Sequence, residues 1–93
     1  MSCLAWTIEV SHAALKKLGK LDKAVARRIR DELREISALE DPRSRGKALV
    51  GNLAGLWRYC VGDYCIVCDI EDGVLVVLVV DVDQRKNVYR HRG

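Results

Sequence analysis

The sequence lacks an apolar run long enough to cross a bilayer. Its main apolar stretch, Val74 to Val80, falls far short of the roughly 20 residues that a transmembrane helix needs. The residues after Met1 also lack the basic start and apolar stretch of a secretory signal. We therefore expect a soluble protein that has no membrane partner and stays in the cytoplasm. Repeats and low-complexity segments are absent too, and a length of 93 residues predicts a single domain spanning residues 1–93.

The cysteines lack the arrangement of a metal site. They are Cys3, Cys60, Cys65 and Cys68. The last two have the C-x-x-C spacing, but they fall within a strand-like run, where residues three apart point to opposite faces. A structural zinc site needs a turn at that place and usually a second pair of ligands. We therefore expect no metal, no cofactor, and free thiols, which are the default in a reducing cytosol.

Charge is distributed unevenly along the chain, although the net charge is only +3. Residues 61–83 lack Lys and Arg entirely but contain six acids. The flanking segments, residues 42–60 and 84–93, contain no acid, and their cations are Arg43, Arg45, Lys47, Arg58, Arg85, Lys86, Arg90 and Arg92. If these two segments meet in space, they form a surface that attracts a polyanion. On charge alone, an ordinary solvated surface is the better explanation.

Helical periodicity covers residues 12–39. Ser11 is a suitable N-cap for a first helix, which Gly19 ends. Asp22 is a suitable N-cap for a longer second helix, and Asp41-Pro42 stops it because proline disfavours the helical conformation in the residue before it. The apolar positions of the second helix form one stripe, which predicts a buried face; they are Val25, Ala26, Ile29, Leu33, Ile36 and Leu39.

Four segments are predicted strands: residues 5–10, 56–61, 64–70 and 74–82. Gly62-Asp63 suits a two-residue hairpin turn, and residues 71–73 make the next turn. Residues 43–55 are predicted to be a loop, and the residues from Gln84 a short basic tail. The order β-α-α-β-β-β predicts an α+β fold, in which a two-helix hairpin packs on one face of an antiparallel sheet and leaves the other face open.

Strand alternation assigns the side chains of the predicted hairpin to two faces. With the turn at Gly62-Asp63, Cys60 pairs with Cys65, and paired residues share a face. The residues predicted to line the open face are then Arg58, Cys60, Cys65, Val67 and Asp69. The residues predicted to join the core are Trp57, Ile66, Cys68 and Ile70. The pairing also predicts that Cys60 and Cys65 can oxidise to a cross-strand disulfide.

A series of short segments then carries a resemblance. It begins with Trp6 and the run from Ala13 to Leu18, and its strongest parts are Asp41-Pro42-Arg43, Gly46-Lys47-Ala48-Leu49, Gly55-Leu56-Trp57-Arg58, Val61-Gly62-Asp63-Tyr64, Arg85 and Val88-Tyr89. Together these segments resemble the RelE family of bacterial toxins over nearly the whole chain. Their basic set favours RelE over the related gyrase-poisoning ParE toxins, which share the fold.

The resemblance implies a ribosome-dependent endoribonuclease of a type II toxin–antitoxin pair. Such toxins enter the ribosomal A site and cut mRNA without a metal, because the messenger 2′-OH attacks the adjacent phosphorus and leaves a 2′,3′-cyclic phosphate. Matched by position, Lys47 and Arg58 contact the phosphate, Arg85 stabilises the transition state and Tyr89 positions the scissile nucleotide. Further RNA contacts are expected from Arg43, Arg45, Lys86, Arg90 and Arg92.

Four positions depart from the family pattern. Relatives usually have Arg where this chain has Cys60 and Cys65, and often Gly-His-Arg or Gly-Lys-Arg where it has Asp83-Gln84-Arg85. Two cations are thus missing, and one acid is added beside the expected site. Losing one cation that stabilises a transition state commonly costs about 100-fold in rate. We therefore hypothesise a weakened or inactive toxin, whose activity Cys60→Arg and Cys65→Arg would restore.

The resemblance also implies partners and two alternative functions. The expected partners are a cognate RelB-like antitoxin, the ribosomal A site with its mRNA, and operator DNA for the toxin–antitoxin complex. An inactive copy would still bind its antitoxin, as a co-repressor or as an antitoxin sink. A ParE-like gyrase inhibitor is the third interpretation.

Overall fold

The computed structural model describes residues 6–90, and the side chains of residues 6–87. Its elements in chain order are β1 (Thr7–Val10), α1 (His12–Gly19), α2 (Lys23–Ser37), the 3-10 helix η1 (Pro42–Ser44), β2 (Lys47–Ala48), β3 (Trp57–Val61), β4 (Tyr64–Glu71), the 3-10 helix η2 (Asp72–Val74), β5 (Val76–Gln84) and α3 (Arg85–Arg90). This is the predicted α+β order with two additions, β2 and α3. No helix in residues 6–90 is long and apolar enough to span a membrane.

The strands form one sheet in the order β1-β5-β4-β3-β2. β2, β3, β4 and β5 pair antiparallel, as predicted, but β1 pairs parallel with β5. The β3–β4 register places Cys60 opposite Cys65 across the turn at Gly62-Asp63, which confirms the predicted hairpin. A bulge between Val67 and Cys68 shifts the β4–β5 register.

The two N-terminal helices form as the sequence predicts, but the second ends early. The Ser11 side chain accepts a hydrogen bond from the Ala14 N–H at 3.1 Å and caps α1. α2 stops at Ser37, so Leu39 lies outside the helix, and Asp22 makes no side-chain capping bond. The end of α2 is tied to the sheet instead, because the Trp6 main-chain N–H donates to the Ser37 carbonyl at 3.0 Å. The expected stop at Asp41-Pro42 is therefore wrong by one turn.

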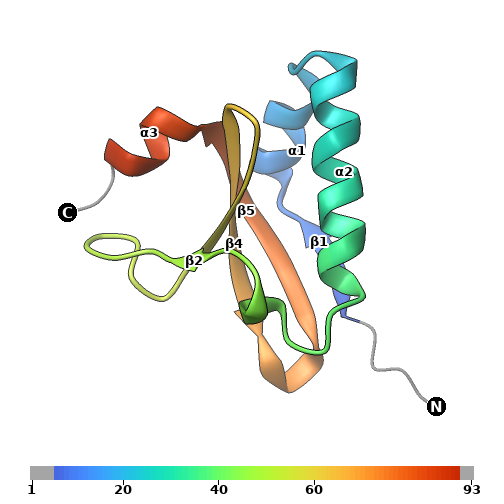
Figure 1. Cartoon of the computed structure of the whole chain (residues 1–93), viewed down its shortest axis with the longest axis vertical. Helices are drawn as coiled ribbons and strands as arrows, with labels where there is room; N and C mark the ends of the chain where they lie inside the picture. The colour runs from blue at the N-terminus through green and yellow to red at the C-terminus, as the bar shows by residue number, and fades with distance from the viewer. Residues whose placement is uncertain (1–5, 91–93) are drawn as a thin grey trace.

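The main core lies between these helices and one face of the sheet. α1 and α2 lie on the same side of the strands (Figure 1). The buried residues of this core are Trp6, Ala14, Ile29, Leu33, Ile36, Tyr59, Ile66, Cys68, Val77, Val79 and Val82. The apolar stripe of α2 thus faces the sheet as predicted, and Trp57 packs against the same core while remaining partly exposed.

The opposite face of the sheet is not open, which corrects the prediction from the strand pattern. The β2–β3 connection and α3 both lie on this side (Figure 1). A second apolar group, hereafter the outer cluster, is built there from Leu49, Cys65 and Val67, with Leu53, Leu56, Cys60 and Val80 packed against them. The segment predicted to be a polar loop therefore folds back because its leucines have apolar strand residues to cover.

Tyr59 is 1% exposed, and its hydroxyl donates to the carbonyl of Pro42 at 2.7 Å. We predict that Tyr59→Phe lowers the free energy of unfolding by about 1 kcal/mol, because it removes a buried hydrogen bond and leaves the Pro42 carbonyl only the longer bond from the Arg45 N–H at 3.4 Å. Urea unfolding measures this change. Tyr64→Phe is the matched control, since Tyr64 is only partly buried against the same core. Equal losses in the two variants would contradict the role given to the Tyr59 hydroxyl.

Candidate functional site

Two cations face each other across the β2–β3 ladder. Lys47 is the direct partner of Arg58, and the next pair is Ala48 with Trp57. Like charges that lie opposite each other destabilise a sheet, so this pair favours an anion that binds between them. Arg58 also donates to the Cys60 sulfur at 3.3 Å, whereas Lys47 forms no ion pair within the described side chains.

A hollow of about 230 Å³ lies beside this pair, and we call it the basic hollow. Its lining residues are Glu32, Arg45, Gly46, Lys47, Arg58, Tyr59 and Cys60. The sequence analysis missed Glu32, whose side chain is 22% exposed. A signal for it exists, because Glu32 follows Ile29 by three residues and precedes Ile36 by four, so it sits on the apolar stripe of α2.

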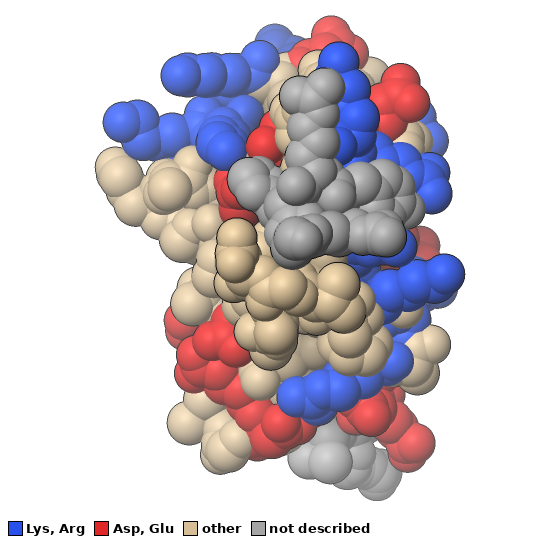
Figure 2. All heavy atoms as spheres, turned by 90° about the vertical axis from the view of Figure 1, so that its left-hand side faces the viewer, with Lys and Arg blue, Asp and Glu red and all other residues tan. Residues whose placement is uncertain are grey.

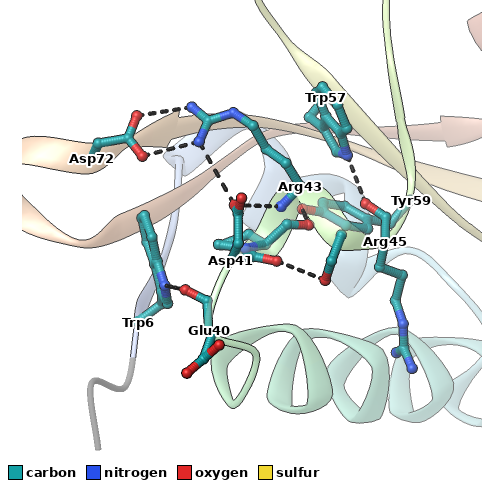
Figure 3. Close-up of polar contacts among 10 residues, drawn as sticks. Trp6, Glu40, Asp41, Arg43, Arg45, Trp57, Tyr59 and Asp72 are labelled. Carbon is teal, nitrogen blue, oxygen red and sulfur yellow. Dashed lines mark hydrogen bonds and ion pairs between the residues drawn. The ribbon is translucent and has the colours of Figure 1, made fainter.

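Arg45 ties the start of β2 to α2. Its guanidinium donates to Glu35 at 2.9 Å and to Glu32 at 3.3 Å, and the hydrogen bond to Glu35 followed by the charge of Glu32 raises the pKa of Arg45. Its carbonyl accepts from Trp57 Nε1 at 2.7 Å (Figure 3). Arg45 therefore lines the basic hollow while it also anchors the segment that presents Lys47.

Gly46 allows this segment to lie directly on β3. Its φ is +78°, a value that favours glycine. A Cβ at this position would overlap the carbonyl oxygen of Arg58 and lie 2.7 Å from Cδ1 of Tyr59. The absence of a side chain thus brings the backbone close enough for Lys47 to pair with Arg58.

Arg43 lies apart from the basic hollow. It forms a two-bond ion pair with Asp72, with both distances 2.9 Å (Figure 3). Arg43 is not among the residues that line the basic hollow. Asp72 follows the end of β4, whereas the Asp63 turn, which accepts from the Arg85 N–H, precedes its start, so roughly 25 Å of strand separates Asp72 from that turn. The structure therefore uses Arg43 to fasten η1 to the β4–β5 turn, far from Arg85.

A disulfide joins Cys60 to Cys65 on the sheet face that carries the outer cluster. The predicted cross-strand pairing is confirmed, and the expectation that all thiols are free is wrong. Cys65 is 1% exposed and belongs to the outer cluster, whereas Cys68 points into the main core, as strand alternation predicts. Burial raises the pKa of the Cys68 thiol to about 12, so this thiol is inert.

Asp83 continues the same row, because it is the β5 partner of Cys65. Its carboxylate accepts from the Asn87 side chain at 3.0 Å and from the Gln84 N–H at 2.8 Å. It thereby holds the first turn of α3, where the sequence predicted only a tail. The acid that departs from the family pattern thus has a structural role at the junction of β5 and α3.

A second basic group lies at this junction. Arg85 and Lys86 line a hollow of about 470 Å³ together with Asp63 and Gln84, and the Arg85 N–H donates to the Asp63 carbonyl at 2.7 Å. Tyr89 and Arg90 belong to α3, but their side chains, like all of Arg92, lie outside the described part.

The two basic groups lie on the same side of the sheet, but the disulfide and Asp83 separate them. Cys60 and Asp83 are two strands apart, which corresponds to roughly 10 Å. On this side, Lys and Arg gather at the upper left and along the right of Figure 2, where some acids lie among them, a larger group of acids lies at the lower left, and uncharged residues lie below the grey atoms at the centre. A chain-like polyanion is long enough to contact both groups at once.

The family model of the ParE toxin of type II toxin–antitoxin systems (parDE) matches residues 8–89. The chain belongs to this toxin family. No curated protein matches the sequence of the toxin.

Several solved structures similar to the toxin carry the RelE name. The RelBE2 toxin–antitoxin complex of Mycobacterium tuberculosis is 25% identical with a TM-score of 0.80, over 90% of this chain and 95% of that one. The isolated E. coli RelE toxin is 28% identical with a TM-score of 0.72, over 92% and 93%. The intact E. coli RelBE complex is 25% identical with a TM-score of 0.70, over 86% and 96%. The RelE/ParE fold and superfamily are therefore established, whereas the separation from ParE toxins that we inferred from the basic residues finds no support in the family model.

We predict that Gly46→Ala destabilises the toxin more than Gly55→Ala does. Both glycines have positive φ, at +78° and +98°, but a Cβ at Gly55 meets nothing within 4 Å. Gly55→Ala should cost about 1–2 kcal/mol for the backbone conformation alone, and Gly46→Ala about 1–3 kcal/mol more for the overlap with β3. Urea unfolding of both variants measures the difference. Equal costs would show that close packing at Gly46 does not constrain β2.

The hydrogen bond from Arg43 lowers the pKa of Asp72 below its ordinary value of 3.8. This pair therefore stabilises the fold above the ordinary pKa, and the stabilisation is lost as the pH falls through the lower folded value. We predict that the carboxyl carbon of Asp72, followed by NMR, titrates below 3.8 in the parent toxin and returns toward that value in Arg43→Gln. An unchanged midpoint in Arg43→Gln would contradict the structural role of Arg43.

Proposed function

We propose that this toxin is a metal-independent, ribosome-dependent mRNA endoribonuclease of the cytoplasm, with an activity lowered by its departures from the family pattern. The observation that carries the proposal is the direct pairing of Lys47 with Arg58 beside the basic hollow. Two cations in this position suit a phosphate, because an anion between them relieves their repulsion and can bind both. The similarity to solved RelE structures supports the same proposal.

In the proposed reaction, the messenger 2′-OH attacks the adjacent phosphorus and the 5′-oxygen leaves. Lys47 and Arg58 hold the phosphate and the charge that develops on it, and Arg85 adds a cation from the start of α3. Glu32, the carboxylate that lines the basic hollow, accepts the proton of the 2′-OH. We assign Tyr89 to positioning the scissile nucleotide, and Lys86, Arg90 and Arg92 to ribosomal RNA. Arg45, which lies just before β2 and pairs with Glu32 and Glu35 of α2, adds a further positive charge to the basic hollow.

The proposed weakening has two physical sources. Cys60 borders the basic hollow without the charge of an arginine, and its sulfur accepts a hydrogen bond from Arg58. Asp83 adds a negative charge between the two basic groups, where RNA phosphates would pass. Cys65 is buried in the outer cluster, so Cys65→Arg would place a charge in an apolar environment, and Cys60→Arg is the more informative restoration.

We further propose that an antitoxin of the RelB type is the partner, and that the complex binds operator DNA. The similar solved structures include complexes of RelE with RelB. Antitoxin binding without RNA cleavage is the second candidate function, because the disulfide and Asp83 separate the two basic groups. The ParE name of the matching family model favours gyrase as the target to be tested beside the ribosome.

The test is cleavage of mRNA on purified ribosomes, followed by primer extension. We predict that Cys60→Arg raises the cleavage rate by about 10- to 100-fold over Cys60→Ser, which lacks the disulfide but adds no charge. Lys47→Gln, Arg58→Gln and Glu32→Gln should each lower the rate by about 100-fold. The control is Arg34→Gln, because the Arg34 side chain is 81% exposed on α2.

The outcomes separate the candidates. Equal rates for Cys60→Arg and Cys60→Ser would contradict the proposed weakening. No cleavage by any variant, with antitoxin binding intact, would replace the endoribonuclease by the binding function. DNA breaks that depend on gyrase, without RNA cleavage, would identify a gyrase inhibitor.

A further inference from the structure

The Cys60–Cys65 disulfide is unevenly exposed. Cys65 is 1% exposed and is covered by the outer cluster, whereas Cys60 is partly exposed. Of the two cysteines, Cys60 alone lines the basic hollow. A thiolate that approaches from solvent therefore reaches the Cys60 sulfur, and the Cys65 sulfur leaves toward the apolar cluster.

The charged residues around Cys60 determine which external thiolates approach it most readily. The hollow brings together three cations, Arg45, Lys47 and Arg58, with one carboxylate, Glu32. Arg45 is engaged with Glu32 and Glu35, whereas Lys47 forms no ion pair among the side chains of residues 6–87, so Lys47 supplies positive charge at the opening of the hollow. An attacking thiolate that carries a second negative charge is attracted there, and a cationic thiol is repelled.

We propose that Cys60 is a thiol-exchange site for small anionic thiols, with the basic hollow as their binding site. In the first step the external thiolate bonds to the Cys60 sulfur, the disulfide breaks, and Cys65 takes the electron pair and then a proton from solvent, because its apolar surroundings disfavour a thiolate. A second external thiolate then attacks the mixed disulfide and releases the external disulfide with Cys60 as a thiolate. In total, two external thiols are oxidised to one disulfide, and the protein disulfide is reduced to two thiols.

This site is distinct from the other cysteines. Cys68 is fully buried in the main core and has a raised pKa, so it does not compete. Arg58, which donates to the Cys60 sulfur, stabilises the Cys60 thiolate once the disulfide opens. The exchange chemistry does not depend on RNA cleavage, so it stands or falls independently of the proposed function.

The experiment uses the full chain with Cys3→Ser, purified without reductant. Three probes are compared at equal thiolate concentration: mercaptoethanesulfonate, 2-mercaptoethanol and cysteamine, with a correction for thiol nucleophilicity. Reactions are quenched in acid, alkylated and analysed by mass spectrometry, where chymotryptic cleavage after Tyr59 and Tyr64 separates Cys60 from Cys65. A count of free thiols before the reaction establishes the disulfide.

We predict a mixed disulfide on Cys60 that forms about tenfold faster with mercaptoethanesulfonate than with 2-mercaptoethanol, and slowest with cysteamine. The preference should shrink in 1 M salt and in Lys47→Gln, but not in Arg34→Gln. In Cys65→Ser, Cys60 is a free thiol. Its rates of mixed-disulfide formation with the oxidised forms of the three probes should follow the same order. Equal corrected rates, an adduct on Cys65, or three free thiols in the unreduced Cys3→Ser protein would overturn the proposal.

Discussion

The attachment of residues 42–46 to Tyr59 is the constraint on which the candidate site depends. The Tyr59 hydroxyl holds the Pro42 carbonyl, and the Tyr59 ring lies against the space where Gly46 has no side chain. Between these two contacts the chain has a fixed length and direction, so β2 begins where Lys47 faces Arg58. A core residue on one face of β3 thus decides which cations meet on the other side of the strand.

Some of the basic residues form ion pairs that connect segments of the fold, and others are left at the surface beside the basic hollow. Arg43 is fastened to Asp72, and Arg45 to the carboxylates of α2. These pairs are exposed, and exposed pairs stabilise proteins only weakly, but they orient the segments that carry them. Lys47 is presented by those segments, which explains why neighbouring cations in one sequence block have different roles.

The fold and the target of this toxin are separate questions. The family model has the ParE name and the similar structures have the RelE name, so one scaffold is shared by toxins with different names. Function on a shared scaffold is decided by the side chains of the site. In the proposed function, those side chains are the Lys47–Arg58 pair, together with the disulfide and the Asp83 carboxylate that separate this pair from Arg85.

The sequence by itself determined the helices, the hairpin and the pairing of Cys60 with Cys65, because each depends on local periodicity or on one short turn. It also placed Cys65 and Cys68 on opposite faces, since strand alternation is local as well. Tertiary structure decided what covers the second face. The leucines of the β2–β3 connection lie in a glycine-containing segment that forms no regular helix or strand, and only the assembled sheet offers them the apolar surface that they bury. Tertiary structure also placed Glu32 in the lining of the basic hollow and paired Arg43 with Asp72. Contacts between distant segments depend on packing that no local sequence pattern encodes.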